Sequence, residues 1–317
     1  MKEFGGYIEF EHNNGNEYYS DLINLNCGRN CLAYILKARA IRKIYLPYFL
    51  CNSVDDVCKK YNVKIEYYNI GQDFLPEFNK KVSDNEALYI VNFYGQISDK
   101  EIKRYKEKYK NIIVDNAQAF FNKPIDNIDT IYTCRKYFGV PDGAYLKTYK
   151  KLDEELETDV SYQRMNFLLG RYEQGAEKFY SEYVDNNKLF KNEPIKYMSK
   201  LTHNLLRSID YQFIIKRRTE NFEFLNSKFK KYNKLNLSVP KGAFMYPLYI
   251  ENGSEIKKEL IKRKIFIPTL WPDVFDKTDK CAMEYDMAKN ILPIPIDQRY
   301  NEEDMDYIMQ EVITCIN

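Results

Sequence analysis

The amino-acid sequence predicts an α/β protein: a large domain with a mostly parallel sheet flanked by helices, followed by a small C-terminal α+β domain. Three observations indicate this fold. Short strand patterns alternate with helical patterns from about residue 26, which is typical of a parallel sheet covered on both faces. Polar, tyrosine-rich helical patterns follow from residue 150 to about 230, and strand patterns then return. We therefore predict domains over residues 1–210 and 211–317.

The first half of the chain supplies the strands and helices of the predicted sheet. In the first helix Leu32, Ile35 and Leu36 lie on one side at helical spacing. The run from Ala87 to Asn92 has the continuous apolar character of a buried strand. By these criteria we expect helices over residues 30–42, 52–61 and 99–109, and strands over 43–46, 63–68, 87–92, 112–115, 130–133 and 144–146.

The second half of the chain has a different character. Few helix breakers interrupt residues 196–228, which predicts one long helix. An apolar run at 244–250, a helix at 254–263, a second apolar run at 265–268 and a closing helix at 301–315 follow. These segments predict a compact α+β tail that shares an interface with the first domain.

Composition excludes several classes of function. The 317 residues include 48 basic and 46 acidic ones, a net charge of +2, so no overall field recruits nucleic acid or an anionic membrane. Seven cysteines without a C-x-x-C pair, and only two histidines, argue against a disulfide framework and a metal site. No segment resembles a signal peptide or a membrane span, so we expect a cytoplasmic protein.

Polar residues at the ends of apolar runs are the candidates for chemistry, because functional groups gather at the carboxyl ends of parallel strands. Asp115 ends one strand pattern, Lys136 follows another, and Gly28-Arg29 begins an early helix. Each alone is more often structural, since such an aspartate caps a turn and such a lysine lies on the surface. Neither G-x-G-x-x-G nor G-x-x-x-x-G-K-[ST] occurs, which disfavours nucleotide cofactors.

Together, these residues meet the requirements of one cofactor. Pyridoxal phosphate needs a lysine amine, a carboxylate that keeps its pyridine nitrogen protonated, and donors for its phosphate. Lys136 and Asp115 supply the first two. The N–H groups at the helix start near Gly28 and Arg29 lack intrahelical partners and suit a phosphate.

The order of segments resembles that of the DegT-DnrJ-StrS sugar aminotransferases, a fold-type-I group of pyridoxal-phosphate enzymes. The resemblance covers roughly residues 20 to 315. It is carried by the Gly28-Arg29 helix start, Leu46-Pro47-Tyr48-Phe49, Val91-Asn92-Phe93-Tyr94-Gly95-Gln96, Val114-Asp115-Asn116-Ala117-Gln118-Ala119, Arg135-Lys136 ahead of Asp142-Gly143, Ile265-Phe266-Ile267-Pro268 with Leu270-Trp271-Pro272, and Leu292-Pro293-Ile294-Pro295-Ile296-Asp297.

The resemblance implies a role for each candidate residue. Lys136 would form the internal aldimine and, once released by substrate, move a proton between the substrate and the cofactor. Asp115 would pair with the pyridinium nitrogen, since an opposite charge favours the protonated ring. Gln118 would bond near the phenolic oxygen of the cofactor.

The resemblance also assigns the phosphate-binding groups. Thr133 would take the place of a phosphate-binding serine, and Gly28 and Arg29 would offer backbone N–H groups to the same phosphate.

The sequence departs from the family at contacts with substrate and partner subunit. Cys51 stands where the family has an aromatic residue that stacks on the cofactor, so Tyr48 or Phe49 would have to serve after a small shift. The loop Val140–Ala144 differs from the family's Gly-Glu-Gly-Gly, and the segment that reaches across the dimer is not recognisable.

We therefore expect an aminotransferase that moves an amino group from glutamate to a nucleotide-linked keto sugar, in cell-surface polysaccharide or related biosynthesis. The resemblance implies a homodimer. Two alternatives stay open: a sugar dehydratase, which Lys136 disfavours because those relatives lack the lysine, and a silent member that acts as a pyridoxal-phosphate-binding or regulatory module. Arg299 is a further candidate for a substrate carboxylate, although a surface arginine is more common there.

Overall fold

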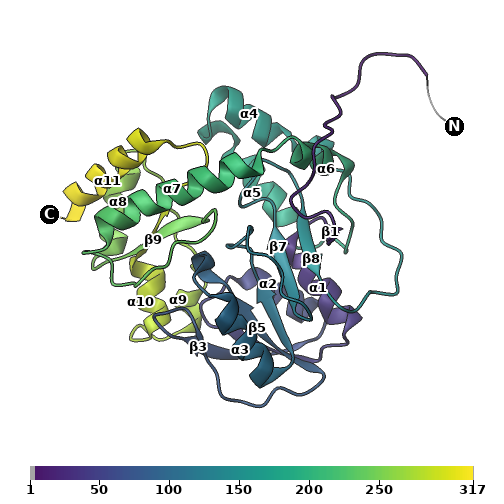
Figure 1. The fold of residues 1–317 in the computed structure, drawn as a ribbon, viewed down its shortest axis with the longest axis horizontal. Coiled ribbons are helices and arrows are strands. Elements are labelled where there is room, and N and C mark those ends of the chain that lie inside the picture. The colour runs from purple at the N-terminus through teal and green to yellow at the C-terminus, as the bar shows by residue number, and fades with distance from the viewer. Residues whose placement is uncertain (1–3, 317) are drawn as a thin grey trace.

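The computed structural model describes residues 4–316, and an eight-stranded sheet forms the centre of the N-terminal part (Figure 1). The strand order is β1-β8-β7-β6-β5-β2-β3-β4. Parallel pairs join β3, β2, β5, β6 and β7, whereas both edges are antiparallel. The predicted α/β class is confirmed. The strands are β1 Ile23–Leu25, β2 Lys43–Pro47, β3 Lys64–Ile70, β4 Pro76–Glu77, β5 Glu86–Val91, β6 Ile112–Asp115, β7 Asp129–Thr133 and β8 Ala144–Lys147.

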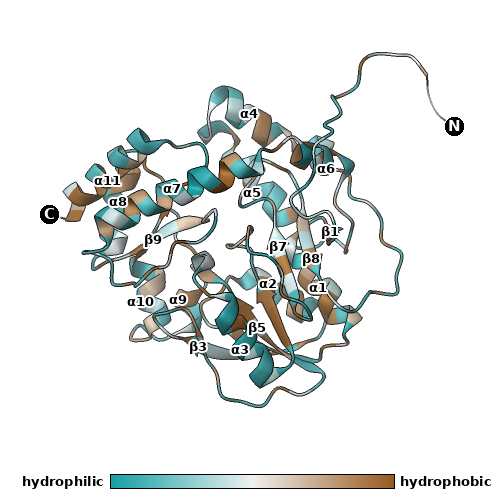
Figure 2. Ribbon diagram, viewed as in Figure 1, coloured by the Kyte–Doolittle hydropathy of each residue, from teal (hydrophilic) through white to brown (hydrophobic). Residues whose placement is uncertain are grey.

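The central strands are apolar because both faces of the sheet are covered (Figure 2). Their parallel register aligns the carboxyl ends, with Val91 of β5 paired to Asp115 of β6, and Asp115 paired to Ile131 of β7. The residues that end these strands therefore lie at one edge of the sheet.

Three helices pack on this sheet near the positions that the sequence predicts: α1 Gly28–Ala38, α2 Asn52–Lys60 and α3 Asp99–Tyr109. The apolar face of α1 is buried through Cys31, Leu32 and Ile35, which fits its helical spacing. Ser98 caps α3, since its Oγ accepts a hydrogen bond from the Glu101 N–H at 3.3 Å.

The predicted single helix over residues 196–228 is wrong. The chain forms α6 Lys200–Arg207 and α7 Tyr211–Phe229, separated by a turn. Asp210 begins α7, because its Oδ1 accepts a hydrogen bond from the Phe213 N–H at 2.9 Å. Before α6, the chain forms α4 Asn166–Gln174 and α5 Tyr180–Leu189, and short 3-10 turns lie at η1 Phe93–Gly95, η2 Tyr162–Arg164 and η3 Glu177–Phe179.

The C-terminal part has its own small sheet, in which β9 Met245–Tyr249 pairs antiparallel with β10 Ile291–Pro295. Helices α7, α8 Gly253–Lys262 and α11 Glu302–Ile316 pack around it, and α9 Val274–Lys277 and α10 Met283–Asn290 complete this part. The apolar run at 265–268 forms no strand, although Ile265 and Ile267 are buried.

Helix α7 spans two hydrophobic cores. Ile214 and Ile215 pack against aromatic residues of the N-terminal part, whereas Phe222 and Leu225 belong to the C-terminal core. The two parts are thus joined through one helix, and the division between residues 210 and 211 stays a prediction.

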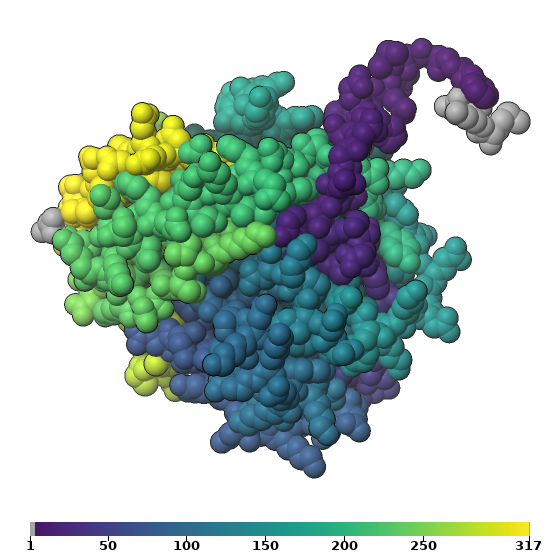
Figure 3. All heavy atoms as spheres, viewed as in Figure 1, coloured from purple at the N-terminus to yellow at the C-terminus, as the bar shows by residue number. Residues whose placement is uncertain are grey.

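The N-terminal residues extend away from the body of the molecule (Figure 3). Tyr7, Ile8 and Phe10 in this segment are exposed. Within residues 4–316, no helix has both the length and the apolar character needed to cross a membrane.

Candidate active site

A cavity of about 300 Å³, here called the first cavity, lies where β5, β6 and β7 end. The start of α1, the start of α2, helix α5 and Trp271 complete its wall. Parallel strands bring their carboxyl ends to this edge, which is where ligands of α/β proteins bind. Six of the predicted site residues line the cavity, namely Gly28, Arg29, Asp115, Gln118, Thr133 and Lys136.

The structure does not bring Tyr48 or Phe49 to the first cavity. The ring of Tyr48 stacks on Tyr67 at a centroid distance of 5.1 Å. Phe49 is buried against Phe93 and Trp271, at centroid distances of 5.3 and 4.5 Å. The small shift that either ring would need to stack on a cofactor is therefore not present.

Trp271 is an aromatic residue of the cavity wall that the sequence did not single out as a site residue. It comes from the C-terminal part and lines the first cavity together with Cys51. Its φ of 55° lies in the left-handed region, which is uncommon for a bulky residue and is often found at functional sites. It is also the only tryptophan in the sequence, so tryptophan fluorescence reports on the wall of this cavity.

Two hydrogen bonds fix the carboxylate of Asp115, which is 9 % exposed. Its Oδ2 accepts from the Tyr89 hydroxyl at 2.8 Å, and its Oδ1 accepts from the Ala117 N–H at 2.8 Å. Gln118 is held in a similar way, because its Oε1 accepts from the Tyr94 N–H at 2.8 Å. The side-chain amide N–H₂ of Gln118 is thereby left as a donor for a ligand.

Lys136 is exposed and lies on a turn directly after β7. The Cys134 carbonyl closes this turn by accepting from the N–H groups of Tyr137 and Phe138, both at 2.9 Å. Within the described part of the chain, no hydrogen bond or ion pair holds the Lys136 Nζ, which lies 5.6 Å from the centroid of the Phe244 ring. The amine is therefore available to react.

A second cavity of about 390 Å³ adjoins the first one. The two share Arg135, Lys136 and Tyr183 in their walls. Arg171 from α4 also lines the second cavity. Lys136 thus lies in the wall of both cavities.

Cationic side chains gather at one end of the first cavity, here called the anion end and defined by Gly28, Arg29, Arg135 and Asn187. The Asn187 carbonyl accepts from Arg29 Nη1 at 2.9 Å, and its Oδ1 accepts from Arg135 Nη2 at 2.6 Å. The guanidinium of Arg135 also lies over the Phe190 ring, 4.8 Å from its centroid. Neither arginine has a carboxylate partner among residues 4–316.

The charge of Arg135 is incompletely compensated. Its Nε is buried and has no hydrogen-bond partner among the described residues. Burial lowers the pKa of the Arg135 guanidinium from its ordinary value, and nearby Arg29 and Arg164 lower it further. A bound anion would supply the missing acceptor and charge. The only sequence signal for Arg135 was its place next to Lys136.

The start of α1 also contributes to the anion end of the first cavity. Cys27 precedes this helix without a side-chain hydrogen bond to it, so the first N–H groups of the helix are not capped by a side chain. Thr133 lies opposite, since a Cβ placed on Gly28 would stand 3.9 Å from the Thr133 Cβ. Helix start, hydroxyl and guanidinium groups are thus assembled around one space. No cluster of His, Cys, Asp or Glu in residues 4–316 has the arrangement of a metal site.

Comparison with protein-family models finds no match, and comparison with curated proteins finds none either. Solved structures do match. The chain superposes on a DegT DnrJ EryC1 StrS aminotransferase from Brucella abortus with a TM-score of 0.61, 13 % identity, and coverage of 92 % of this chain and 85 % of that chain. The chain has a fold-type-I aminotransferase fold.

Two further structures agree with this aminotransferase fold. NtdA from Bacillus subtilis, solved with bound cofactor PMP, gives a TM-score of 0.66 at 15 % identity, covering 95 % of this chain and 74 % of that chain. PseC from Helicobacter pylori, an aminotransferase involved in pseudoaminic acid biosynthesis, gives 0.62 at 12 % identity, covering 92 % and 85 %.

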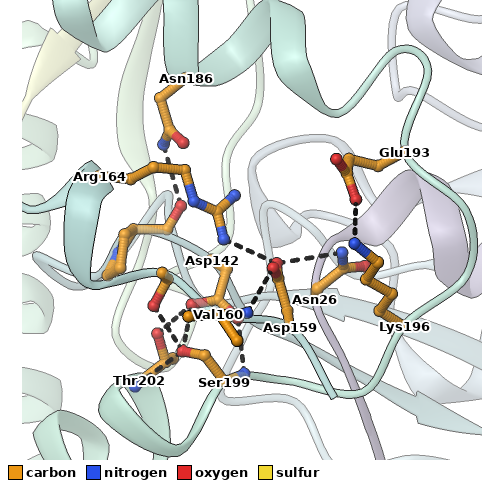
Figure 4. Close-up of polar contacts among 12 residues, drawn as sticks. Asn26, Asp142, Asp159, Val160, Arg164, Asn186, Glu193, Lys196, Ser199 and Thr202 are labelled. Atoms are coloured by element: carbon orange, nitrogen blue, oxygen red, sulfur yellow. Dashed lines mark hydrogen bonds and ion pairs between the residues drawn. The ribbon is translucent and has the colours of Figure 1, made fainter. Parts of the chain in front are cut away.

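In this aminotransferase fold, a buried polar network anchors the loop that follows Lys136 (Figure 4). The fully buried carboxylate of Asp142 accepts from the N–H of Ser199 at 2.8 Å and from its hydroxyl at 2.7 Å, and also from the Thr202 hydroxyl. The next residue, Gly143, donates its N–H to the Asn26 carbonyl at 2.6 Å. The Asp142-Gly143 pair therefore fixes the loop to α6 and to the segment before α1.

Arg299, the candidate for a substrate carboxylate, is already paired. Its Nε and Nη2 donate to the two oxygens of Asp297 at 2.6 and 2.8 Å. This fork-to-fork pair occupies the donors that a carboxylate would use. Arg171 has no such pair among residues 4–316 and is the better placed cation of the second cavity.

Proposed function

We propose that this chain is a pyridoxal-phosphate-dependent aminotransferase of the DegT-DnrJ-StrS type. The observation that carries the proposal is the convergence of Lys136, Asp115 and the anion end on one cavity. An amine, a fixed carboxylate and a phosphate-binding group are the parts that this cofactor requires. Solved structures of the same fold include one with PMP bound, which supports the choice of cofactor.

The residues of the first cavity fit the cofactor. The anion end has donors without an acceptor, which suits a phosphate, and the Asp115 carboxylate is held in place for a ring nitrogen. Lys136 presents an amine that no residue of the described chain holds by a hydrogen bond or ion pair. When bound, pyridoxal phosphate supplies an electron sink for the substrate carbon.

Each residue has a defined task in the proposed reaction. Lys136 would hold the cofactor through its Nζ and, once released, would move a proton at that atom. Asp115 would face the pyridine nitrogen and favour its protonated form. Gln118 would offer its side-chain N–H to the phenolic oxygen. Thr133, the helix start and the Arg29 and Arg135 guanidinium groups would bind the phosphate.

We propose glutamate as the amino donor, which leaves as 2-oxoglutarate, and a nucleotide-linked keto sugar as the acceptor, in cell-surface polysaccharide or related biosynthesis. The second cavity supports small-molecule substrates, because it adjoins Lys136 and carries Arg171, which has no ion-pair partner among residues 4–316. PseC, an aminotransferase involved in pseudoaminic acid biosynthesis, shares the fold. The resemblance further supports a cytoplasmic homodimer.

The purified protein tests the proposal through its single tryptophan. Adding pyridoxal phosphate should quench the Trp271 fluorescence and produce visible absorbance. Borohydride reduction followed by peptide mapping should then find the cofactor on Lys136. We expect Lys136→Ala to lose the visible band, whereas Lys150→Ala, which changes an exposed lysine outside both cavities, should retain it.

Glutamate then separates the aminotransferase from the silent module. An active enzyme should lose its visible band on addition of glutamate and release an equal amount of 2-oxoglutarate. A protein that binds the cofactor but does not respond to any amino donor would be the silent alternative. Failure of the wild type to take up the cofactor at all would contradict both.

A further inference from the structure

Tyr89 is the one side chain in residues 4–316 that donates a hydrogen bond to Asp115. It is 2 % exposed and lies in β5, next to the strand that Asp115 ends. Its hydroxyl donates to Asp115 Oδ2 at 2.8 Å, while the Ala117 N–H donates to Oδ1. Each carboxylate oxygen therefore accepts one hydrogen bond, and the plane of the carboxylate is fixed.

The sheet determines this contact. Val91 pairs with Asp115 across β5 and β6. Tyr89 lies two positions before Val91, so both side chains point to the same face, where both line the first cavity. The length of the phenol lets its hydroxyl reach the carboxylate from this position.

The Tyr89 hydroxyl keeps its proton. Burial raises its pKa well above the ordinary value, and the negative charge of Asp115 raises it further. Three thiols also lie near this pair, Cys31 of α1 and Cys51 and Cys58 at α2. The cationic groups that line the same cavity are Arg29, Arg135 and Lys136. Burial raises the pKa of Cys31 and Cys58, so these two groups add no charge near neutral pH.

We propose that Tyr89 is a positioning residue that keeps the Asp115 carboxylate aimed at the ring nitrogen of the bound cofactor. A donor to the charged form of a carboxylate stabilises that form. A carboxylate that is already oriented does not have to be ordered again when the ligand binds. This inference rests on the proposed function, because it assigns Tyr89 a task toward pyridoxal phosphate.

The test replaces Tyr89 with Phe, which removes only the hydroxyl. Tyr105→Phe is the matched control, because Tyr105 is also buried and its hydroxyl donates to the Pro76 carbonyl at 2.8 Å, away from both cavities. Each variant is titrated with pyridoxal phosphate by Trp271 fluorescence. The visible band of the loaded protein is then followed against pH, and thermal unfolding shows that each variant is folded.

We expect Tyr89→Phe to bind pyridoxal phosphate roughly tenfold more weakly, the size of effect for a lost hydrogen bond to a charged group. The pH midpoint of its visible band should fall by roughly half a unit, because a carboxylate that is no longer held toward the ring stabilises the protonated cofactor less. Tyr105→Phe should match the wild type in both measurements.

The outcomes separate this inference from the proposed function. If the wild type takes up no pyridoxal phosphate, both are overturned. If the wild type binds it and Tyr89→Phe shows the same affinity and the same pH midpoint, the role of Tyr89 is wrong while the proposed function stands.

Discussion

Arg135 shows how a single residue can define the polarity of a cavity. Its guanidinium is held by Asn187 and by the Phe190 ring, but neither contact neutralises its charge. A buried cation without a carboxylate is unfavourable in the free protein. The burial of this guanidinium becomes favourable when an anion binds. We therefore assign Arg135 to the binding of the cofactor phosphate.

The first prediction at this scale concerns Arg135→Met, which retains an apolar side chain against Phe190 and removes the charge. We expect the affinity for pyridoxal phosphate to fall about tenfold or more, the usual effect of losing a charge-assisted hydrogen bond. The affinity for pyridoxal, which has no phosphate, should not change. Both affinities are measured by quenching of Trp271 fluorescence.

Arg171→Met is the control for this change, since Arg171 lines the second cavity but not the first. It should leave the affinity for pyridoxal phosphate unchanged. An equal loss of affinity for pyridoxal and pyridoxal phosphate in Arg135→Met would show that Arg135 supports the cavity wall rather than the phosphate.

The sequence predicted the part of the site that strand order determines. Asp115 and Lys136 follow apolar runs, and the parallel sheet aligns the ends of those runs. Tyr89 lies inside a buried strand, and Trp271 enters from the C-terminal part, so their approach to the cavity depends on tertiary packing. A single sequence does not specify that packing, and no periodic pattern could have found either residue.

Among the elements, the loop after Lys136 depends on one buried carboxylate. Asp142 accepts hydrogen bonds from two residues at the start of α6 (Figure 4). We expect Asp142→Asn to lower the free energy of unfolding by about 2–4 kcal/mol, because the amide N–H₂ cannot accept from these donors and the stabilising charge is lost. Urea denaturation of the cofactor-free protein measures the change.

The same substitution at Asp210 is the control. Asp210 caps α7 at an exposed position, and Asn is an equally good helix cap, so Asp210→Asn should change the free energy of unfolding by less than about 0.5 kcal/mol. Equal urea midpoints for wild type and Asp142→Asn would show that the network does not anchor the loop.

At the same scale, the sequence predicted the strands and helices of the N-terminal part better than it predicted the helices between residues 150 and 230. Residues 196–228 lack Gly and Pro, so the pattern predicted no break. The break comes instead at Asp210, whose side chain accepts a hydrogen bond from the Phe213 N–H at the start of a new helix. The apolar run at 265–268 forms no strand, because Ile265 and Ile267 are buried in the C-terminal core without strand pairing.

For the whole molecule, Arg218 helps to connect the two parts near the site. It is 2 % exposed in α7 and donates to the carbonyls of Ala243 and Phe244 at 3.0 and 3.2 Å. Its Nε donates to Gln298 Oε1 at 2.8 Å. Gln298 in turn donates to the Tyr137 carbonyl at 2.9 Å, so the turn that carries Lys136 is tied to the C-terminal part.

Arg218→Met should therefore affect both stability and cofactor binding. Several buried carbonyls lose their donor at once, so we expect the free energy of unfolding to fall by about 3 kcal/mol. Pyridoxal phosphate should also bind several-fold more weakly, because the turn after β7 is less ordered and binding must order it. Arg217→Met, on the same helix but only half-buried, should change neither quantity appreciably. Urea denaturation measures the free energy of unfolding of both variants, and titration by Trp271 fluorescence measures their affinity for pyridoxal phosphate. A loss of stability with unchanged affinity would mean that Arg218 joins the two cores without positioning Lys136.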